Sequence, residues 1–358
     1  MKRTQLKQLL THDIPDLKDK SLLIWGTGDT ACLYQEGLNR IDLGRKIIGY
    51  CDSNKTKWGK KFYGKPILAP SELSEYKNTV VLICSLQPHV NREIMSQLES
   101  LNIENYLIDE VILKIHHKDV LQCYDLLYDT ESKRIFAELI KSRLSGINPN
   151  KNIISGDTYF IWRQIASQDI DAGTFIDCGA YVGDTIEKYI WYKDGVFNKI
   201  IAIEPDYENF HAMLRRKQRL CEEWNLKETS IELIQAGVGE KTADYYFTRS
   251  NNGLGSKFAE SDDEGNLQKI FALDELINEP YSFLKADVES FEYKMLLGAK
   301  KGIQQWKPNL AISIYHNSVD LFSLAVLIHS FVPEYKIVLR HHLDTLAETV
   351  LYAWVDKQ

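Results

Sequence analysis

The chain has 358 residues, of which 44% are hydrophobic and 26% charged, and its net charge is −7. This composition excludes wholesale disorder and argues against a nucleic-acid backbone as the main partner, and the length predicts two domains of ordinary size. None of the six cysteines forms a C-x-x-C pair, which favours reduced thiols over a disulfide or zinc framework. They are Cys32, Cys51, Cys84, Cys123, Cys178 and Cys221.

Targeting features are absent from the sequence pattern. The first twenty residues are charged throughout and lack the apolar centre of a signal peptide. No apolar run reaches the roughly 20 residues that a membrane-spanning helix needs. We therefore expect a cytoplasmic protein with no membrane span and no nucleic-acid partner; a homodimer is compatible with the sequence.

Residues 1–110 predict a small Rossmann-like α/β domain. A strand at 21–25 runs into Gly26-Thr27-Gly28 and a helix, and a second strand at 46–51 ends at Asp52. A glycine turn with an acid at the tip of the next strand is the fingerprint of a nucleotide-binding β-α-β unit. Further elements complete the domain: helices at 2–10, near 71 and at 88–101, and strands at 66–68, 79–84 and 106–108.

The ligand of this domain is less defined by the sequence. Gly26, Gly28 and Asp52 are the candidate nucleotide or sugar-nucleotide residues, but the unit has no second half to hold a nicotinamide. The segment also resembles the N-terminal domains of bacterial sugar acyltransferases, through the glycine turn, I-G-Y-C-D at 48–52 and G-K-P-I at 64–67. This resemblance implies a sugar-nucleotide ligand, which we prefer over NAD. A scaffold that has lost its ligand is the alternative.

Residues 111–150 carry apolar residues at helical spacing, which predicts one or two amphipathic helices that connect the domains. The helices should end at Gly146 and Pro149. Tyr159 and Phe160 follow this connector, and we expect them to cap a cofactor pocket in the second domain.

Residues 151–358 predict a second α/β domain with its own glycine turn. A strand at 174–177 leads through Asp177, Gly179 and Gly183 into a helix, and the next strand ends at Glu204. The turn reads D-x-G-x-x-x-G and not G-x-G-x-x-G, which favours a nucleoside without a pyrophosphate, and therefore S-adenosylmethionine over NAD. We expect Asp177, Gly179 and Gly183 to contact the methionine part and Glu204 the ribose.

The rest of the second domain alternates strands with helices. Gly237 and Val238 follow the third strand, where the base of a nucleoside would lie. The predicted fold is α/β, with the Rossmann-like sheet of a class I methyltransferase whose last strand is antiparallel. The remaining expected elements are an inserted β pair at 243–248 and 267–273, strands at 281–286, 309–315, 335–340 and 349–355, and helices at 291–302 and 319–331.

Six segments carry a family resemblance in order and spacing: FIDCGAYVGDT, IIAIEPD, AGVGE, ALDEL, FLKADVESFE and LAISIYHNSVDL. From residue 159 to the C-terminus the chain resembles the FkbM-type methyltransferase family. The resemblance implies S-adenosylmethionine as cofactor and methylation of hydroxyl oxygens on sugars or polyketide-like metabolites. Ser290 departs from the family, which usually has glycine after D-V-E, and should crowd that loop.

Asp287, Glu289 and His316 are the candidate catalytic residues, because each follows a strand of the same parallel sheet. A free alcohol is a poor nucleophile, so a base should stand beside it, and His316 has the pKa range for that role. Asp287 could orient the histidine or face the sulfonium. Two carboxylates and an imidazole could also hold a magnesium-like or transition ion, but such sites usually show more acids, so we expect no metal.

Together these patterns predict an S-adenosylmethionine-dependent O-methyltransferase. Its acceptor would be a small molecule or saccharide, with the methylated hydroxyl on a saccharide or nucleotide-linked sugar, in surface polysaccharide or secondary-metabolite biosynthesis. Two alternatives stay open. One is an NAD(P)-dependent oxidoreductase that uses the first glycine turn, and the other is a non-catalytic nucleotide-sugar binding protein.

Overall fold

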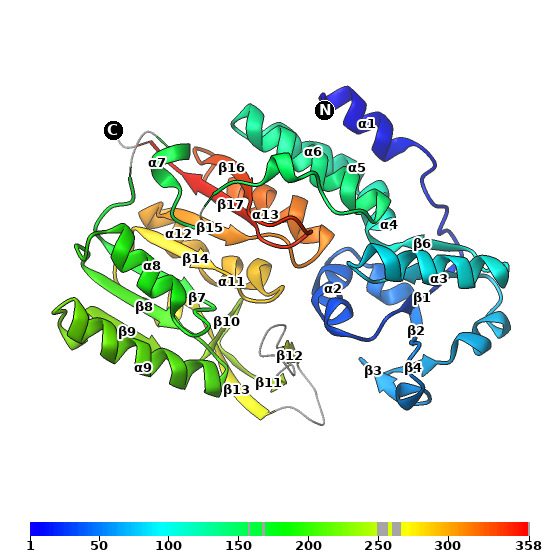
Figure 1. Cartoon of the computed structure of the whole chain (residues 1–358), viewed down its shortest axis with the longest axis horizontal. Helices are drawn as coiled ribbons and strands as arrows, with labels where there is room; N and C mark the ends of the chain where they lie inside the picture. The colour runs from blue at the N-terminus through cyan, green and yellow to red at the C-terminus, as the bar shows by residue number, and fades with distance from the viewer. Residues whose placement is uncertain (157, 167–168, 249–256, 260–265, 357–358) are drawn as a thin grey trace.

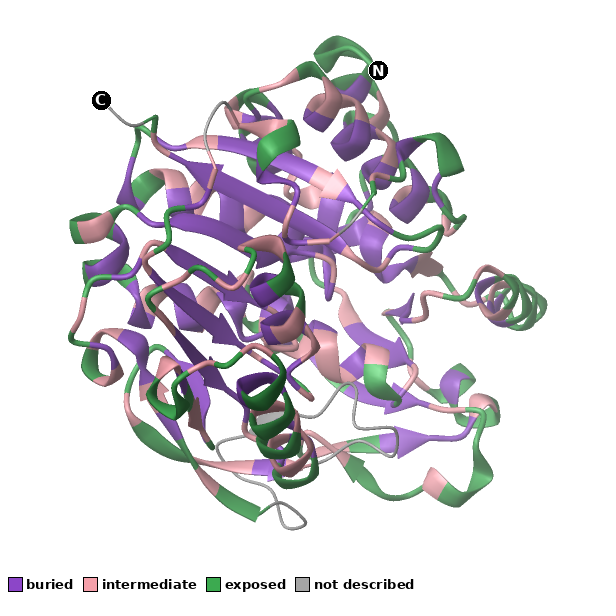
Figure 2. Ribbon diagram, turned by 60° about the vertical axis from the view of Figure 1, so that its left-hand side comes forward, coloured by how far each residue is buried: buried purple, intermediate pink, exposed green. Residues whose placement is uncertain are grey.

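The structure is a computed structural model that describes residues 1–156, 158–166, 169–248, 257–259 and 266–356. Two mainly parallel sheets lie side by side, with helices α4 to α6 above the junction (Figure 1). The strands are largely buried and the outer helical faces exposed (Figure 2), as expected for parallel sheets covered on both faces.

The first sheet has the strand order β3-β4-β2-β1-β5-β6, and all its neighbours are parallel except β3 and β4. Its strands are β1 (Ser21–Trp25), β2 (Ile47–Cys51), β3 (Lys61–Phe62), β4 (Lys65–Leu68), β5 (Thr79–Ile83) and β6 (Asn105–Leu107). Its helices are α1 (Arg3–Thr11), α2 (Asp29–Arg40) and α3 (Pro88–Ser100), with short 3-10 turns at Leu43–Lys46, Lys55–Lys57 and Pro70–Glu75. The small α/β unit expected in the first third is present.

The connector contains three helices and not the one or two that we expected: α4 (Ile108–Ile115), α5 (His117–Leu126) and α6 (Thr130–Ser145). The first break falls at His116, and the second precedes Asp129, whose side chain caps α6 by accepting a hydrogen bond from the Ser132 N–H. Apolar spacing continues across both breaks, so periodicity alone could not reveal them.

The second sheet has the order β16-β17-β15-β14-β7-β8-β9, with β17 antiparallel to both of its neighbours. Its strands are β7 (Thr174–Cys178), β8 (Lys199–Ile203), β9 (Ile231–Ile234), β14 (Phe283–Ala286), β15 (Asn309–Ser313), β16 (Lys336–His341) and β17 (Thr349–Trp354). The associated helices are α7 (Trp162–Ile165), α8 (Asp184–Tyr192), α9 (Tyr207–Glu223), α10 (Leu273–Leu276), α11 (Glu292–Gly298), α12 (Lys300–Trp306) and α13 (Ser318–Phe331). This arrangement confirms the predicted fold class.

Two details of the second half refine the expectation. The helix expected over 291–302 is divided at Ala299 into α11 and α12. Gly298 lies so close to the neighbouring chain that a Cβ there would stand 2.0 Å from the Gly239 carbonyl oxygen. The expected inserted β pair forms part of a four-stranded sheet of order β10-β13-β11-β12, with β10 (Gly237–Gly239), β11 (Ala243–Thr248), β12 (Lys257–Ala259) and β13 (Asn266–Ala272).

Helix α2 connects the two halves directly. The Leu33 carbonyl accepts hydrogen bonds from Ser290 Oγ at 2.7 Å and from Asn317 Nδ2 at 3.3 Å. A Cβ at Gly37 would stand 2.7 Å from Asn317 Oδ1, so a larger residue there would push the helix away. Arg40 pairs with the fully buried Asp320. The helix that follows the first glycine turn therefore supports the loops that hold Glu289 and His316 in the second half.

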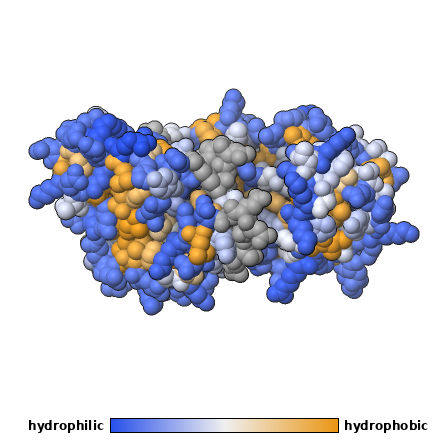
Figure 3. Space-filling model, turned by 90° about the horizontal axis from the view of Figure 1, so that it is seen from below, coloured by the Kyte–Doolittle hydropathy of each residue, from blue (hydrophilic) through white to orange (hydrophobic). Residues whose placement is uncertain are grey.

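Seen from below, both halves are mainly hydrophilic, and the apolar side chains that show gather mostly on the half with the second sheet (Figure 3). None of the helices in the described ranges combines the length and apolar character needed to cross a lipid bilayer. All six cysteines carry free thiols, and five of them are buried.

Candidate active site

A cavity of about 450 Å³ opens at the carboxyl ends of β7, β8 and β14. This is the edge where parallel α/β sheets bind ligands, because the loops that follow the strands converge there. Of the residues proposed from the sequence for the cofactor and the chemistry, six line it: Gly179, Glu204, Gly237, Val238, Asp287 and Glu289. Asp177, Gly183 and His316 are not among its lining residues.

Glu204 stands at the tip of β8 and is 6% exposed. Its Oε2 accepts a hydrogen bond from the Tyr181 N–H at 2.9 Å, and its Oε1 accepts from the Asp206 N–H at 3.0 Å and Asn209 Nδ2 at 3.4 Å. Burial raises the pKa of Glu204 to about 7, against the lowering effect of these hydrogen bonds. The carboxylate is thus held in place at the cavity wall.

The second glycine turn packs tightly against the next strand. Gly179 has φ +73, and a Cβ there would stand 1.8 Å from the Asp287 carbonyl oxygen, so the turn needs glycine. Gly183 also has a positive φ and starts α8, where a Cβ would stand 3.0 Å from Met213. Gly179 shapes the cavity itself, whereas Gly183 shapes the helix start beneath it.

Asp177 does not reach the cavity, which corrects our expectation that it would line the methionine part. It is fully buried within β7, and its Oδ1 pairs with Lys285 Nζ at 2.9 Å. Lys285 lines the cavity and donates a further hydrogen bond to the Gly179 carbonyl at 2.7 Å. Burial would lower the pKa of Lys285, but Asp177 and Asp287 raise it, so the ammonium stays charged.

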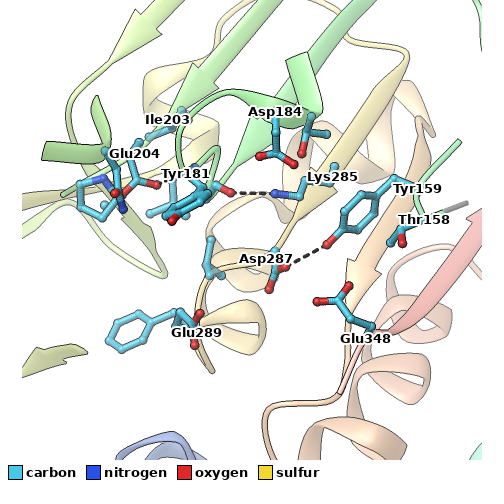
Figure 4. A pocket seen from close by; sticks show the side chains of 18 of the residues that line it. Thr158, Tyr159, Tyr181, Asp184, Ile203, Glu204, Lys285, Asp287, Glu289 and Glu348 are labelled. Atoms are coloured by element: carbon cyan, nitrogen blue, oxygen red, sulfur yellow. Dashed lines mark hydrogen bonds between the residues drawn. The ribbon is translucent and has the colours of Figure 1, made fainter. Parts of the chain in front are cut away.

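Asp287 is the centre of the other end of the cavity (Figure 4). Its Oδ2 accepts a hydrogen bond from the Tyr159 hydroxyl at 2.8 Å, and its Oδ1 accepts from the Tyr315 hydroxyl at 3.3 Å. Burial alone would raise the pKa of Asp287, but the imidazole of His316 beside it holds that pKa well below its usual range. Tyr159 therefore covers the cavity as expected, and Asp287 stays ionised.

His316 lies behind Asp287 and is 1% exposed. Its Nε2 stands 3.3 Å from Asp287 Oδ1 and 3.6 Å from Glu289 Oε2, and its Nδ1 stands 3.2 Å from Glu292 Oε1. Burial would lower the pKa of His316, but Glu292, Glu289 and Asp287 together raise it well above 6.5. A buried and protonated imidazole is not placed to take a proton from a substrate, which disfavours our general-base assignment.

Sequence reasoning missed three charged residues of this site. Lys285 lies inside an apolar strand, where a lysine is unusual, and that signal was available. Glu292 is a third acid close behind Asp287 and Glu289, which the spacing alone could have included. Glu348 comes from the turn before β17, far from the other site residues in the chain, and no sequence motif around it indicates a site residue.

Glu348 faces the cavity with its carboxylate on the side of Tyr159 and Asp287 (Figure 4). Burial raises the pKa of Glu348, and the negative charge of Asp287 raises it further. A carboxylate with a raised pKa that opens into a cavity is the kind of group that can accept a proton at neutral pH.

Ser290 occupies a strained loop. Glu289 and Ser290 have φ values of +53 and +74, a region that glycine adopts without cost and other residues rarely adopt. The positive φ of Ser290 explains why glycine suits position 290, where we expected a serine to crowd the loop. Here the serine has a separate use, because its hydroxyl donates to Leu33 of α2.

The first glycine turn is built differently. Asp52 Oδ2 accepts hydrogen bonds from the Thr27 N–H and hydroxyl and from Lys57 Nζ at 3.0 Å, and Oδ1 accepts from the Asn54 N–H at 2.8 Å. Burial would raise the pKa of Asp52, but Thr27, Asn54 and Lys57 lower it. Gly26 lies against the Cys84 carbonyl, whereas a Cβ on Gly28 would meet nothing within 4 Å. The three predicted residues come together, but the carboxylate is engaged by its own chain.

Comparison with protein families matches two segments. Residues 177–346 match the family described as the Methyltransferase FkbM domain, and residues 18–108 match the family described as C2185-like, N-terminal. The expected similarity to sugar acyltransferases is not confirmed. No curated protein matches the sequence.

Solved structures give further similarity. Methyltransferase FkbM from Methylobacillus flagellatus KT is 21% identical, with 98% of each chain covered and a TM-score of 0.59. An rRNA methylase from Streptococcus thermophilus is 16% identical, covers 53% of this chain and 90% of its own, and has a TM-score of 0.33. SMU.1697c, a putative methyltransferase from Streptococcus mutans solved with SAH, is 13% identical over 57% of this chain and 92% of its own, with a TM-score of 0.31. Residues 177–346 therefore match the Methyltransferase FkbM domain family, and the chain shares its fold with a solved FkbM methyltransferase.

Proposed function

We propose that the protein is an S-adenosylmethionine-dependent O-methyltransferase that acts on a saccharide hydroxyl. One observation carries the proposal: within an FkbM domain, a buried carboxylate at the tip of β8 and a glycine turn at the tip of β7 share one cavity. Its volume of about 450 Å³ lies within the roughly 300–1,000 Å³ that small-molecule sites usually have.

The donor is assigned to the end of the cavity near Glu204. Its ribose hydroxyls would donate to the Glu204 carboxylate, and Gly237 and Val238 would lie beside the base. Gly179 lets the methionine part approach the backbone closely, since a side chain there would not fit. The methyl group would then point to the end of the cavity where Asp287 stands.

Methyl transfer needs few catalytic groups. The acceptor oxygen forms a bond to the methyl carbon while the carbon–sulfur bond breaks, and the electron pair stays on sulfur as S-adenosylhomocysteine forms. The hydroxyl proton must go to a base, and we assign that role to Glu348, which opens into the cavity with a raised pKa. Asp287, held by Tyr159 and His316, orients the acceptor, and alignment of the reacting atoms supplies much of the rate.

The acceptor end of the cavity favours an uncharged polyol. Asp287, Glu289 and Glu348 offer carboxylate oxygens to hydroxyl donors, and Tyr159 and Tyr315 flank them. The acidic side chains that line the cavity outnumber its two lysines, Lys188 and Lys285, so the net negative charge would repel the diphosphate of a nucleotide-linked sugar. We therefore prefer a saccharide hydroxyl over the nucleotide-linked sugar, with surface polysaccharide or secondary-metabolite biosynthesis as the pathway. A cytoplasmic location and a homodimer stay predictions.

Ligand-dependent thermal unfolding of the full chain separates the alternatives. We expect S-adenosylhomocysteine to raise the melting temperature and NADH to leave it unchanged, since a ligand stabilises the folded state that binds it. Transfer of labelled methyl from S-adenosylmethionine to a panel of neutral saccharides would then identify the acceptor. Stabilisation by NADH alone would favour the oxidoreductase, and stabilisation by sugar nucleotides alone the non-catalytic binding protein.

A further inference from the structure

Three side chains converge behind the acceptor end of the cavity. Asp287 follows β14, His316 follows β15, and Glu292 begins α11. One ligand atom from each lies within 4.8 Å of the other two, and no other group of three histidine, cysteine or acidic side chains in the described residues meets that condition. The sequence argued against a metal because it showed too few acids, and Glu292 supplies the missing one.

The hydrogen bonds of this cluster are incomplete. Glu292 is fully buried and His316 is 1% exposed, yet Glu292 Oε2 and both ring nitrogens of His316 lack a well-oriented hydrogen-bond partner among the described residues. A buried polar atom left unpaired costs roughly 1–3 kcal/mol. The ring stands between the two acids, with Nε2 3.3 Å from Asp287 Oδ1 and Nδ1 3.2 Å from Glu292 Oε1. An ion bound by one ring nitrogen could reach both acids, because one ligand atom of each residue lies within 4.8 Å of the other two.

The cluster brings two carboxyl groups, those of Asp287 and Glu292, against one imidazole. The nearby cations already have partners, because Lys285 pairs with Asp177 and Arg40 pairs with Asp320. Buried charges are normally paired or bound to a metal. A divalent cation would balance the charge of two carboxylates.

We propose that Asp287, Glu292 and His316 bind one divalent cation, which enters from the cavity that Asp287 lines. One imidazole with carboxylate oxygens suits manganese or magnesium better than the thiolate-preferring metals. Binding is independent of the proposed function. Its consequence rests on that function: an ion at Asp287 would stand beside the acceptor hydroxyl and favour the loss of its proton to Glu348.

Manganese binding to the full chain, stripped of metal by a chelator and then freed of the chelator, tests the site. We expect about one Mn²⁺ per chain by electron paramagnetic resonance titration, with a dissociation constant below about 100 μM. Pulsed resonance should detect one coupled imidazole nitrogen. Glu292→Gln should weaken binding at least about tenfold, whereas Asp184→Asn, which removes a cavity-lining acid outside the cluster, should not.

Absence of saturable Mn²⁺ binding would overturn the proposal. Binding without nitrogen coupling in the wild type would also overturn it, since the ion would then lie away from His316, and this readout does not depend on whether a variant folds. Circular dichroism of Glu292→Gln shows whether its loss of binding reflects unfolding. Failure of methyl transfer alone would contradict the proposed function and leave the ion site standing.

Discussion

The two glycine turns of this chain each link a parallel strand to a helix, but they differ in what their acids contact. Asp52, after the first turn, is held by Thr27 and by the ammonium of Lys57. Glu204, after the second, contacts backbone N–H groups and an amide, and none of the ion pairs in the described ranges includes it. The position of the cation therefore decides whether such an acid remains available to a ligand.

In the second half, the cation is Lys285 on β14, and it pairs with Asp177 on the neighbouring strand β7 and not with Glu204. Lys285 pairs with Asp177, and both side chains are at most 3% exposed, whereas the Lys57 side chain is 34% exposed. The Lys57–Asp52 pair is partly exposed and engages the acid at the end of the strand, whereas the Lys285–Asp177 pair is buried beneath the second glycine turn. Four predictions test this difference.

The largest expected effect is on stability. Lys285→Met would leave Asp177 buried without its partner, which should lower the free energy of unfolding of the second half by about 3–5 kcal/mol. Lys57→Met removes a partly exposed pair and should cost no more than about 1 kcal/mol. Urea denaturation followed by circular dichroism measures both. Equal losses would show that burial does not distinguish the two pairs.

The second prediction concerns the donor. Glu204→Ala removes charged hydrogen-bond acceptors from the proposed ribose, and it should weaken S-adenosylhomocysteine binding by about 10- to 100-fold, which is about 1.5–3 kcal/mol. Asp52→Ala is the matched control and should leave that affinity unchanged. Isothermal titration calorimetry measures both. Retained affinity in Glu204→Ala would refute the ribose assignment.

The third prediction is a pH dependence. The Glu204 pKa is about 7 in the free protein, above its ordinary value of 4.5. Because only the ionised form accepts both ribose hydrogen bonds, S-adenosylhomocysteine should bind about tenfold more tightly at pH 8 than at pH 6. The folded state binds the proton more strongly than the unfolded state, so the free protein should lose stability as pH rises from about 4.5 to about 7. Both trends should disappear in Glu204→Gln, and an unchanged affinity across this range would contradict the assignment.

The smallest effect should come from the contact between the halves. Ser290→Ala keeps the strained backbone and loses the hydrogen bond to Leu33, whereas Ser290→Gly loses the bond and relieves the strain. The alanine variant should therefore be about 1 kcal/mol less stable than the glycine variant. Urea denaturation measures the difference. Two variants of equal stability would indicate that the backbone strain at Ser290 is negligible.

Most strands could be predicted from the sequence, because apolar runs such as 21–25 and 199–203 end at glycine or acid residues. Because ligands bind at the carboxyl ends of parallel strands, the sequence also predicted that Glu204 and Asp287 share one cavity, although they lie far apart in the chain. Helix breaks at His116 and Ala299 were missed, since apolar spacing runs through both.

Burial and charge were harder to predict than position. His316 follows its strand as expected, but only the packed structure shows that Asp287 and Glu292 enclose its ring. Glu348 reaches the cavity from the turn between β16 and β17, a contact set by the hairpin's path and not by any local motif. Lys285 could have been noticed, but its pairing with Asp177 depends on strand neighbours.

The bare backbone at Gly37 limits how this protein can be re-engineered. An exchange of the first 110 residues for those of a relative would bring a foreign helix against Asn317, and any side chain at that point would collide with its amide. A graft that keeps a glycine there, with an arginine one turn later for Asp320, would preserve the seating of the transplanted domain.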